Sequence, residues 1–329
     1  MNPDNSVKFL FLSVILALAF IGRSDNDFSK VKNTIQENIQ DTSLTAVLKS
    51  QENKVFPSKT AEVSQNLGAF FPQSINIVPY KKNPDISNPN LQVKAAIAKD
   101  LESDFNFYSL NPEDRWALAS LTKLMASVIA LEEIGRDKIA VISKSAVDSE
   151  GPAGNLEVDE KYSINDLMKA MLVVSSNDAA AAIAEFYGTQ NFITKMQQKA
   201  DLLEMRQTTF FDPTGIYFLN QGSVSDLVKL VKYIHKNHPE IFTATKNQKE
   251  TISELTKGIQ KELININNFA SREDFLGGKT GFTDQAEGNL ISLFKYKGHT
   301  ILLIVLGTND RFGQTEMLYN WIKNAYVFN

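Results

Sequence analysis

The sequence predicts an α+β fold, with an antiparallel sheet flanked by helices and a helical lobe inserted into the chain between its strands. Strand-like segments lie at both ends of the region after residue 90, at 91–98 and 106–110 and again at 289–296 and 300–307. Helical patterns occupy the middle of that region. A sheet whose first and last strands come together, with the lobe between them, accounts for this order.

The outer elements are marked by turns. A turn around Asp100–Asp104 joins the first two strands, and Lys297-Gly298 joins the last two as a hairpin. The chain then closes with a helix predicted over 314–327, with Trp321 on its inner face.

The helices of the middle region are predicted from apolar spacing and from residues that start or stop helices. Their predicted ranges are 120–134 followed by Gly135, 163–174 capped by Ser163, 177–187 ended by Gly188, and a helix to about 238 capped by Ser223 or Ser225.

The N-terminus has the residue pattern of an export signal. Residues 9–21 are an apolar run interrupted only by Ser13, and Lys8 precedes it. A spanning helix needs about 20 apolar residues, whereas the apolar part of a signal peptide needs about 7–15. Ala17-Leu18-Ala19 matches a small-x-small cleavage site. We expect 1–23 to be a cleaved signal peptide or an uncleaved membrane anchor, both of which place the protein outside the cytoplasm; a buried strand or helix is the remaining interpretation.

Residues 24–90 form a polar extension. The stretch from Asn53 to Asn90 holds five prolines among many Asn, Ser and Gln residues, a composition typical of a tether. The globular domain is therefore predicted to cover 91–329.

Composition excludes several classes of protein. The net charge of -4 is spread along the chain, which leaves no basic surface for nucleic acid. The chain has no cysteine, so disulfides, thiolate zinc sites and cysteine nucleophiles are excluded. His235 and His238 stand three apart near a predicted helix end, where a metal pair or a solvated helix end are both open interpretations. We expect no cofactor and no metal.

A candidate nucleophile and base lie at the start of the most apolar helix. Ser120 and Lys123 are three residues apart and so share one helix face. A serine hydroxyl becomes a good nucleophile when a base takes its proton, and a buried lysine of lowered pKa can do so. The same Ser-x-x-Lys spacing at Ser29 lies in the polar extension, and at Ser292 it lies in a strand, where the two side chains face opposite sides.

Two further motifs follow in order. Ser175-Ser176-Asn177 lies at a break between two helices, where Ser175 could relay a proton and Asn177 could hold Lys123 or the substrate. Capping of the second helix by Ser176 or Asn177 is the structural alternative.

The third motif is Lys279-Thr280-Gly281 with Phe282 after it, in a glycine-rich strand. Glycine in a strand indicates close approach of another backbone, and an extended peptide could add to such an edge. Lys279 and Thr280 would then face a substrate carboxylate. The preceding residues do not fit a phosphate-binding loop, because Glu273 stands where that loop needs glycine.

Taken together, the three motifs resemble those of serine penicillin-binding proteins and β-lactamases, and most closely those of the D-alanyl-D-alanine carboxypeptidase family. The resemblance covers 91–329, and its stretches are 118–125, 175–180, 212–215 and 278–283.

This resemblance implies a β-lactamase/transpeptidase-like fold and a role for each motif residue. Ser120 is the expected acylated nucleophile and Lys123 its base, with Ser175 and Asn177 as the second catalytic element. Lys279, Thr280, Gly281 and Phe282 are the expected substrate-binding residues, and the backbone N–H groups of Ser120 and Phe282 the expected oxyanion hole.

The implied partners are peptidoglycan stem peptides, with β-lactams as covalent inhibitors. Many family members continue into a further β-rich domain and an amphipathic membrane helix. The given sequence stops after its last predicted helix, so any membrane attachment is expected at the N-terminus.

Three other functions stay open. A β-lactamase would need a carboxylate to activate water, and the candidates are Glu185, Asp201, Glu204 and Asp212. An idle, envelope-anchored binding protein would be expected to lack a motif residue. A Ser-His-Asp hydrolase is disfavoured because no histidine lies in a motif.

Overall fold

The structure is a computed structural model, and it describes residues 80–151 and 154–328. The predicted signal or anchor at 1–23 and most of the predicted extension lie outside the described residues. Among the helices that are described, none is long and apolar enough to cross a membrane.

A five-stranded antiparallel sheet confirms the predicted fold class. Its strand order is β10-β11-β12-β2-β3, so strands from the two ends of the region pair at its centre, where Ile304 of β12 lies opposite Ile97 of β2. The strands are β2 (Ala95–Asp100), β3 (Asn106–Leu110), β10 (Phe275–Thr283), β11 (Glu287–Tyr296) and β12 (His299–Thr308).

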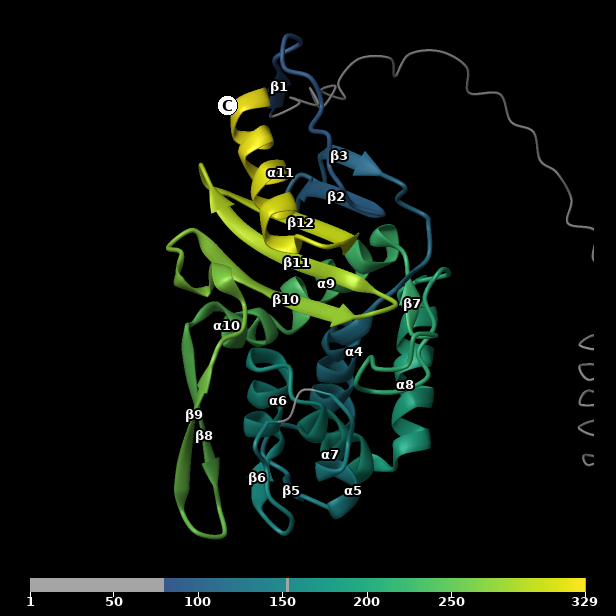
Figure 1. Ribbon diagram of the computed structural model, residues 1–329, viewed down its shortest axis with the longest axis vertical. Helices are drawn as coiled ribbons and strands as arrows, with labels where there is room; N and C mark the ends of the chain where they lie inside the picture. Colours follow the sequence, from purple (N-terminus) through teal and green to yellow (C-terminus); the bar gives the residue numbers. More distant parts are fainter. Residues whose placement is uncertain (1–79, 152–153, 329) are drawn as a thin grey trace, which may run out of the picture. The chain divides into compact units, whose positions relative to one another are not determined.

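Alternating side chains give the sheet two apolar faces. Along β12, Ile301 and Leu303 enter one core, whereas Leu302 and Ile304 enter the other. Helix α11 (Arg311–Ala325) covers the first face, and α9 (Val224–Asn237) and α4 (Thr122–Ile129) cover the second (Figure 1). Because both faces are buried, β11 and β12 read as continuous apolar runs rather than as alternating patterns.

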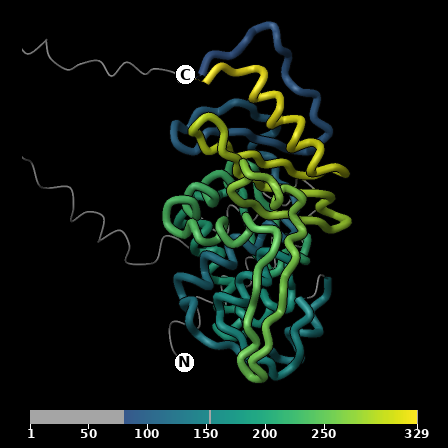
Figure 2. The backbone as a smooth tube through the Cα atoms, turned by 90° about the vertical axis from the view of Figure 1, so that its left-hand side faces the viewer, coloured from purple at the N-terminus to yellow at the C-terminus, as the bar shows by residue number. Residues whose placement is uncertain are grey.

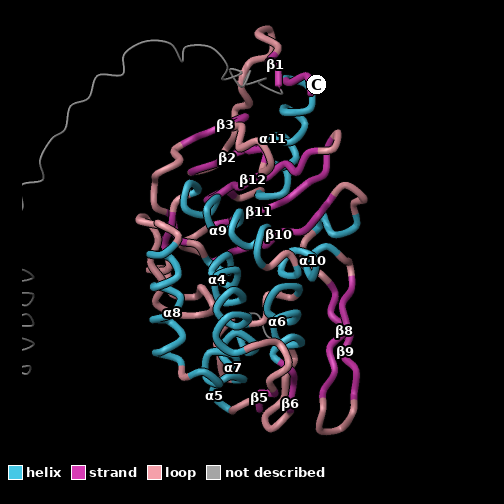
Figure 3. Tube along the Cα trace, turned by 180° about the vertical axis from the view of Figure 1, so that it is seen from behind, coloured by secondary structure: helices cyan, strands magenta, loops and turns pink. Residues whose placement is uncertain are grey.

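The helical lobe lies below the second face of the sheet (Figure 3). Its helices are α4 (Thr122–Ile129), α5 (Lys144–Val147), α6 (Ile164–Val173), α7 (Asn177–Tyr187) and α8 (Thr189–Leu202), and α10 (Glu240–Lys246) contacts β10. The predicted boundaries of α6, α7 and α9 are confirmed, since Ser163, Ser176 and Ser223 each accept a backbone N–H at a helix start.

Short strand pairs complete the fold. They are β4 (Trp116–Ala117) with β7 (Gln221–Gly222), β5 (Ile139–Val141) with β6 (Lys161–Ser163), and β8 (Lys249–Glu254) with β9 (Ile259–Ile264). The β8–β9 hairpin runs beside the lobe (Figure 2). Helix α8 and this hairpin were not predicted.

The packed unit begins before the predicted boundary at residue 91. Strand β1 (Tyr80–Lys82) pairs with β13 (Tyr326–Phe328), and the rings of Tyr80 and Phe328 are buried in the core on the α11 side. The final helix therefore ends at Ala325 and not at Val327, because the last residues alternate as a strand. Strand β2 likewise begins at Ala95 rather than at residue 91.

The predicted helix 120–134 is irregular at both ends. It begins with a 3-10 turn at Ala119–Leu121 and finishes with a π-helical turn over Ala130–Ile134, before Gly135 at φ 93°. Ala119 has φ 48°, a strained backbone conformation for a residue with a side chain. The candidate nucleophile thus lies on a sharp turn against the sheet, one residue after this strained position.

Candidate active site

The first motif places a serine hydroxyl beside a buried amine. Lys123 Nζ donates to Ser120 Oγ over 2.9 Å, and the Lys123 side chain is 0% exposed. Lys123 also donates to Asn177 Oδ1 and to the carbonyl oxygen of Thr214, each over 2.6 Å. A lysine ammonium has three donors, so all of them are used and the amine is fixed toward Ser120.

Burial controls the charge of this amine. Desolvation lowers the pKa of Lys123 to about 7, although the carboxylates of Asp212 and Asp178 partly oppose this effect. Near neutral pH a large fraction of Lys123 is therefore uncharged. A neutral amine within hydrogen-bond distance of a hydroxyl can accept its proton, as the chemistry of an activated serine requires.

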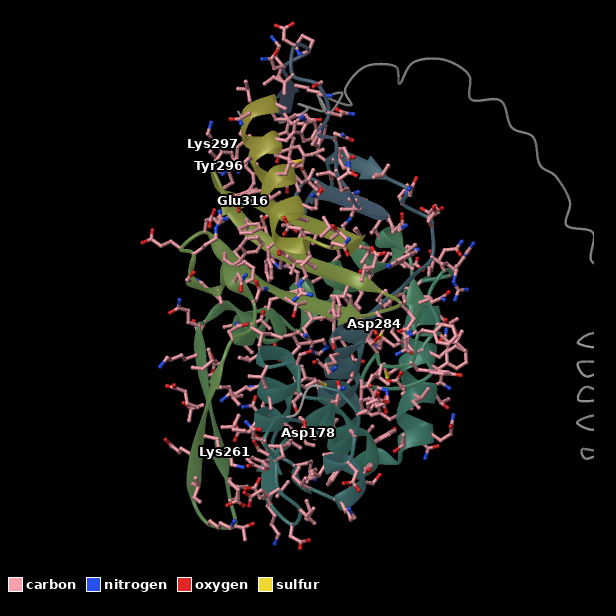
Figure 4. The ribbon with its side chains drawn as sticks, in the orientation of Figure 1. Asp178, Lys261, Asp284, Tyr296, Lys297 and Glu316 are labelled. Atoms are coloured by element: carbon pink, nitrogen blue, oxygen red, sulfur yellow. The ribbon has the colours of Figure 1, made fainter. Side chains whose placement is uncertain are left out.

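The second motif is held in a strained loop before α7. Ser175 has φ 62°, and Asn177 donates from Nδ2 to the carbonyl oxygen of Glu150 over 2.5 Å. Asp178 accepts from the Gly154 N–H at 2.7 Å and from the Ser176 hydroxyl. Figure 4 labels Asp178, which lies in the lobe below the sheet edge. These contacts orient the Asn177 side chain so that its amide oxygen, Oδ1, faces Lys123.

The third motif lies on edge strand β10. Lys279 Nζ donates to Ser175 Oγ and to the carbonyl oxygen of Thr280, both over 2.9 Å. Burial, followed by the charges of Lys123 and Arg311, lowers the pKa of Lys279 well below its usual value. The contact with Ser175 joins the second and third motifs, so the three motifs form one site.

Two glycines allow this close assembly. A Cβ on Gly281 would lie 2.9 Å from the Leu118 carbonyl oxygen and 3.3 Å from the Ser120 nitrogen, so β10 runs against the turn that carries Ser120. On Gly215, which has φ 85°, a Cβ would overlap the carbonyl oxygen of Ala119. The loop after Asp212 and strand β10 therefore approach the same turn.

The structure gives Asp212, which the sequence offered only as a carboxylate for activating water, a structural role at the site, and it adds Arg311, which sequence reasoning missed. Asp212 accepts from the N–H groups of Thr214 and Gly215, both at 2.7 Å, and so aims the Thr214 carbonyl at Lys123. Arg311 donates to the Gly281 carbonyl oxygen over 3.2 Å. Asp212 was visible as part of the Asp-Pro-Thr-Gly stretch, whereas Arg311 lies in no motif and is found only through the fold.

Two of the alternative site residues, His238 and Ser292, can be placed in the structure. His238 Nε2 contacts Glu132 Oε1 at 3.0 Å, and within 80–151 and 154–328 there is no cluster of three or more metal-ligating side chains. Ser292 is buried within β11, and Ser29 lies outside the described residues.

Comparison with known proteins identifies the family. A family model described as D-alanyl-D-alanine carboxypeptidase matches residues 82–310. The chain is 28% identical to a D-alanyl-D-alanine endopeptidase of Escherichia coli, over 73% of this chain and 80% of that protein. It is 27% identical to a D-alanyl-D-alanine carboxypeptidase of Bacillus subtilis, over 71% of this chain and 63% of that protein.

Solved structures share the fold. The crystal structure of a D-alanyl-D-alanine carboxypeptidase from Mycobacterium tuberculosis superposes with a TM-score of 0.68 at 20% identity, covering 76% of this chain and 99% of that one. That of the corresponding enzyme from Francisella tularensis gives 0.65 at 24% identity, covering 72% of each chain.

Proposed function

We propose that this chain, which belongs to the D-alanyl-D-alanine carboxypeptidase family of serine peptidases, removes the terminal D-alanine of peptidoglycan stem peptides through an ester on Ser120. The observation that carries the proposal is the contact between Ser120 Oγ and the buried amine of Lys123, whose pKa is lowered to about 7. Burying a lysine side chain costs free energy. A function for the neutral form of Lys123 would explain why the fold keeps this buried amine.

In the proposed reaction, Ser120 Oγ attacks the carbonyl carbon between the two D-alanines while its proton passes to Lys123. The carbonyl oxygen becomes an anion that accepts from the N–H groups of Ser120 and Phe282. The carbon–nitrogen bond then breaks, and the leaving amine of D-alanine takes a proton through the Ser175 hydroxyl. Water hydrolyses the ester and restores Ser120. Hydrogen bonds from Lys123 to Asn177 and from Lys279 to Ser175 support these positions.

The proposed anchor for the terminal carboxylate is the end of β10. Lys279 and Thr280 lie on this strand and Arg311 beside it, and the Arg311 guanidinium would make the site locally positive. An arriving carboxylate would raise the pKa of Lys279 again, because an opposite charge favours the ammonium form. Selection of substrates with a free C-terminus follows from this arrangement.

The family processes peptidoglycan, which belongs to the cell envelope. We propose that residues 1–23 direct export or anchor the chain there and that the extension after them is a spacer before the folded unit. β-Lactams are proposed as covalent inhibitors that acylate Ser120 and hydrolyse slowly.

The test uses the full chain with excess benzylpenicillin, following intact mass and drug hydrolysis together, and then D-alanine release from a pentapeptide. A lasting adduct at Ser120 together with D-alanine release is the expected result. Fast hydrolysis with a fleeting adduct would indicate a β-lactamase instead. A folded protein that gives neither signal would contradict an enzymatic function altogether.

A further inference from the structure

A group of exposed apolar side chains lies on the loop that holds the catalytic lysine. We call Phe211, Ile216, Tyr217 and Phe218 the aromatic platform; they are 50%, 37%, 47% and 48% exposed. The Tyr217 ring lies 6.0 Å from that of Phe211 and 5.6 Å from that of Phe218, measured between centroids, and both pairs are edge-on. Exposed apolar residues gathered in this way mark binding surfaces more often than scattered ones do.

The backbone beneath the platform is fixed by hydrogen bonds. Asp212 Oδ2 accepts from the Tyr217 N–H over 3.0 Å, and Asn220 Oδ1 accepts from the Phe211 N–H over 2.7 Å. The Asn220 N–H in turn donates to the Tyr217 carbonyl oxygen over 2.9 Å. The rings are thus presented from an ordered loop, which lowers the entropic cost of binding a ligand.

The platform is carried by a loop that contacts the active-site residues. This loop supplies the Thr214 carbonyl that binds Lys123, and Gly215, which precedes Ile216, packs on the carbonyl oxygen of Ala119, directly before Ser120. Phe282, 61% exposed, follows the glycine that packs on the same turn from β10. A polymer whose stem peptide reaches Ser120 would therefore have the platform loop as a neighbour.

The charge of the loop favours an uncharged ligand. Between Phe211 and Asn220 the only charged residue is Asp212, whose oxygens are occupied by backbone N–H groups. One cation contacts the adjoining segment, since Arg115 donates to Thr209. Binding to an anionic membrane usually requires clusters of Lys and Arg beside the aromatic residues, and a single arginine does not supply one.

We propose that the aromatic platform binds sugar rings of the peptidoglycan glycan strand, so that the enzyme acts on stem peptides still attached to it. This inference rests on the proposed function, because it assigns the polymer to the same site. Sugar rings offer apolar C–H faces to aromatic side chains and hydroxyls to polar atoms such as the Tyr217 oxygen. Uncharged rings suit the lack of cations on the loop.

The binding test uses the full chain and glycan strands from which all peptides have been removed and whose freed lactyl carboxylates have been converted to amides, so that the strands stay uncharged. The variant is the double substitution Tyr217→Ser/Phe218→Ser. Its matched control is Leu255→Ser/Ile259→Ser on the β8–β9 hairpin, where the two residues are 46% and 47% exposed. We expect at least about tenfold weaker binding for the platform variant, equal to about 1.4 kcal/mol, and unchanged binding for the control. Equal binding by all three proteins would overturn the proposal.

The activity test separates this inference from the proposed function. On a free pentapeptide, the platform variant should release D-alanine as fast as the wild type; on a pentapeptide attached to a glycan strand, its kcat/KM should fall about tenfold. A variant as active as the wild type on the attached peptide would overturn the platform and leave the carboxypeptidase function standing. A wild type inactive on both peptides would instead overturn the function, while the binding test would still decide the platform.

The last part of the test measures binding to vesicles of phosphatidylglycerol and phosphatidylethanolamine. Residues 1–23 are removed from all proteins, so that the N-terminal apolar segment does not contribute to vesicle binding. The expected result is no vesicle binding that depends on Tyr217 and Phe218. Vesicle binding that is lost in the platform variant, without any loss of glycan binding, would replace the glycan by a lipid surface and overturn the proposal.

Discussion

Replacing Asn177 by aspartate should make the amine of Lys123 a poorer base without changing the size of its neighbour. Asn177 Oδ1 lies 2.6 Å from Lys123 Nζ, within a site where Lys123 is fully buried. An opposite charge at this distance raises the pKa of a lysine, by about 1–3 units at such separations. Asn177→Asp should therefore keep Lys123 protonated to higher pH and slow acylation at neutral pH.

The size of the effect follows from the wild-type value. With a pKa of about 7, about half of Lys123 is neutral at pH 7. A rise of about two units leaves about one part in a hundred neutral, so acylation at pH 7 should slow about 50-fold. In the wild type, the rate should climb about tenfold between pH 6 and pH 8 and then level off, because Lys123 has by then lost its proton.

The assay is the rate of benzylpenicillin labelling, measured by intact mass at half-unit steps from pH 5.5 to pH 9.5. Asn237→Asp, at the exposed end of α9, is the matched control and should behave as the wild type. The reasoning is refuted if wild-type labelling is flat across this range, or if the Asn177→Asp midpoint does not move upward relative to the control. A variant that labels slowly at every pH would show that Asn177 acts through geometry and not through the charge of Lys123.

Three further predictions concern single residues. Ser120→Ala should abolish labelling while leaving the melting temperature unchanged, and an adduct that persists would remove Ser120 from its proposed role. Lys279→Ala should reduce kcat/KM at least tenfold for a peptide with a free C-terminus but hardly for its C-terminal amide. The control Lys297→Ala, in an exposed turn, should change kcat/KM for neither peptide. Equal losses on both peptides in Lys279→Ala would contradict the assignment of Lys279 to the substrate carboxylate. Gly215→Ala should lower the free energy of unfolding by about 2–5 kcal/mol in urea titrations, because it combines a strained φ with overlap against a carbonyl group. Gly258→Ala, also at positive φ but with open space around it, should cost about 1 kcal/mol, and equal costs for the two would contradict the close approach.

Local signals explain the parts of the fold that the sequence predicts well. A serine whose hydroxyl accepts the N–H three residues on, as Ser163 and Ser223 do, is a local signal for a helix start that can be read from the neighbouring residues alone. Gly188, at φ 93°, ends α7 for an equally local reason. The hairpin across Lys297-Gly298 is likewise set by its own turn.

Distant pairing explains the parts that were mispredicted. Tyr80 and Phe328 lie at opposite ends of the described chain, and neither segment carries a strand pattern that can be recognised by itself. Their pairing makes strands of residues that were predicted as the end of a linker and the end of a helix. Helix α8 had a usable signal, since Phe192, Met196 and Ala200 are buried at a spacing of four, but its polar composition obscured it.

The contacts of the candidate site also fall into local ones, which the sequence predicts, and distant ones, which it does not. Ser120 and Lys123 are neighbours on one turn, so their contact follows from spacing. The contacts of Lys123 with Asn177 and Thr214 join three separate segments, and spacing along the chain cannot give them. Arg311 reaches the site only because α11 begins just after β12, whose last residue Thr308 pairs with Gly288 of β11, and Gly288 pairs in turn with Phe282 of β10.

The two buried lysines differ in a way that suits two opposite tasks. Lys123 uses all three of its donors on protein oxygens and lies within reach of two carboxylates, whereas Lys279 uses two donors and has no carboxylate partner among the residues the structure describes. The charge of Lys123 is, after burial, one of the causes that lower the pKa of Lys279, so loss of the proton from Lys123 relieves part of the repulsion on Lys279. In the proposed reaction Lys123 is the base for Ser120, and the donor that Lys279 leaves free binds the anionic end of a substrate, whose charge would favour the ammonium form of Lys279.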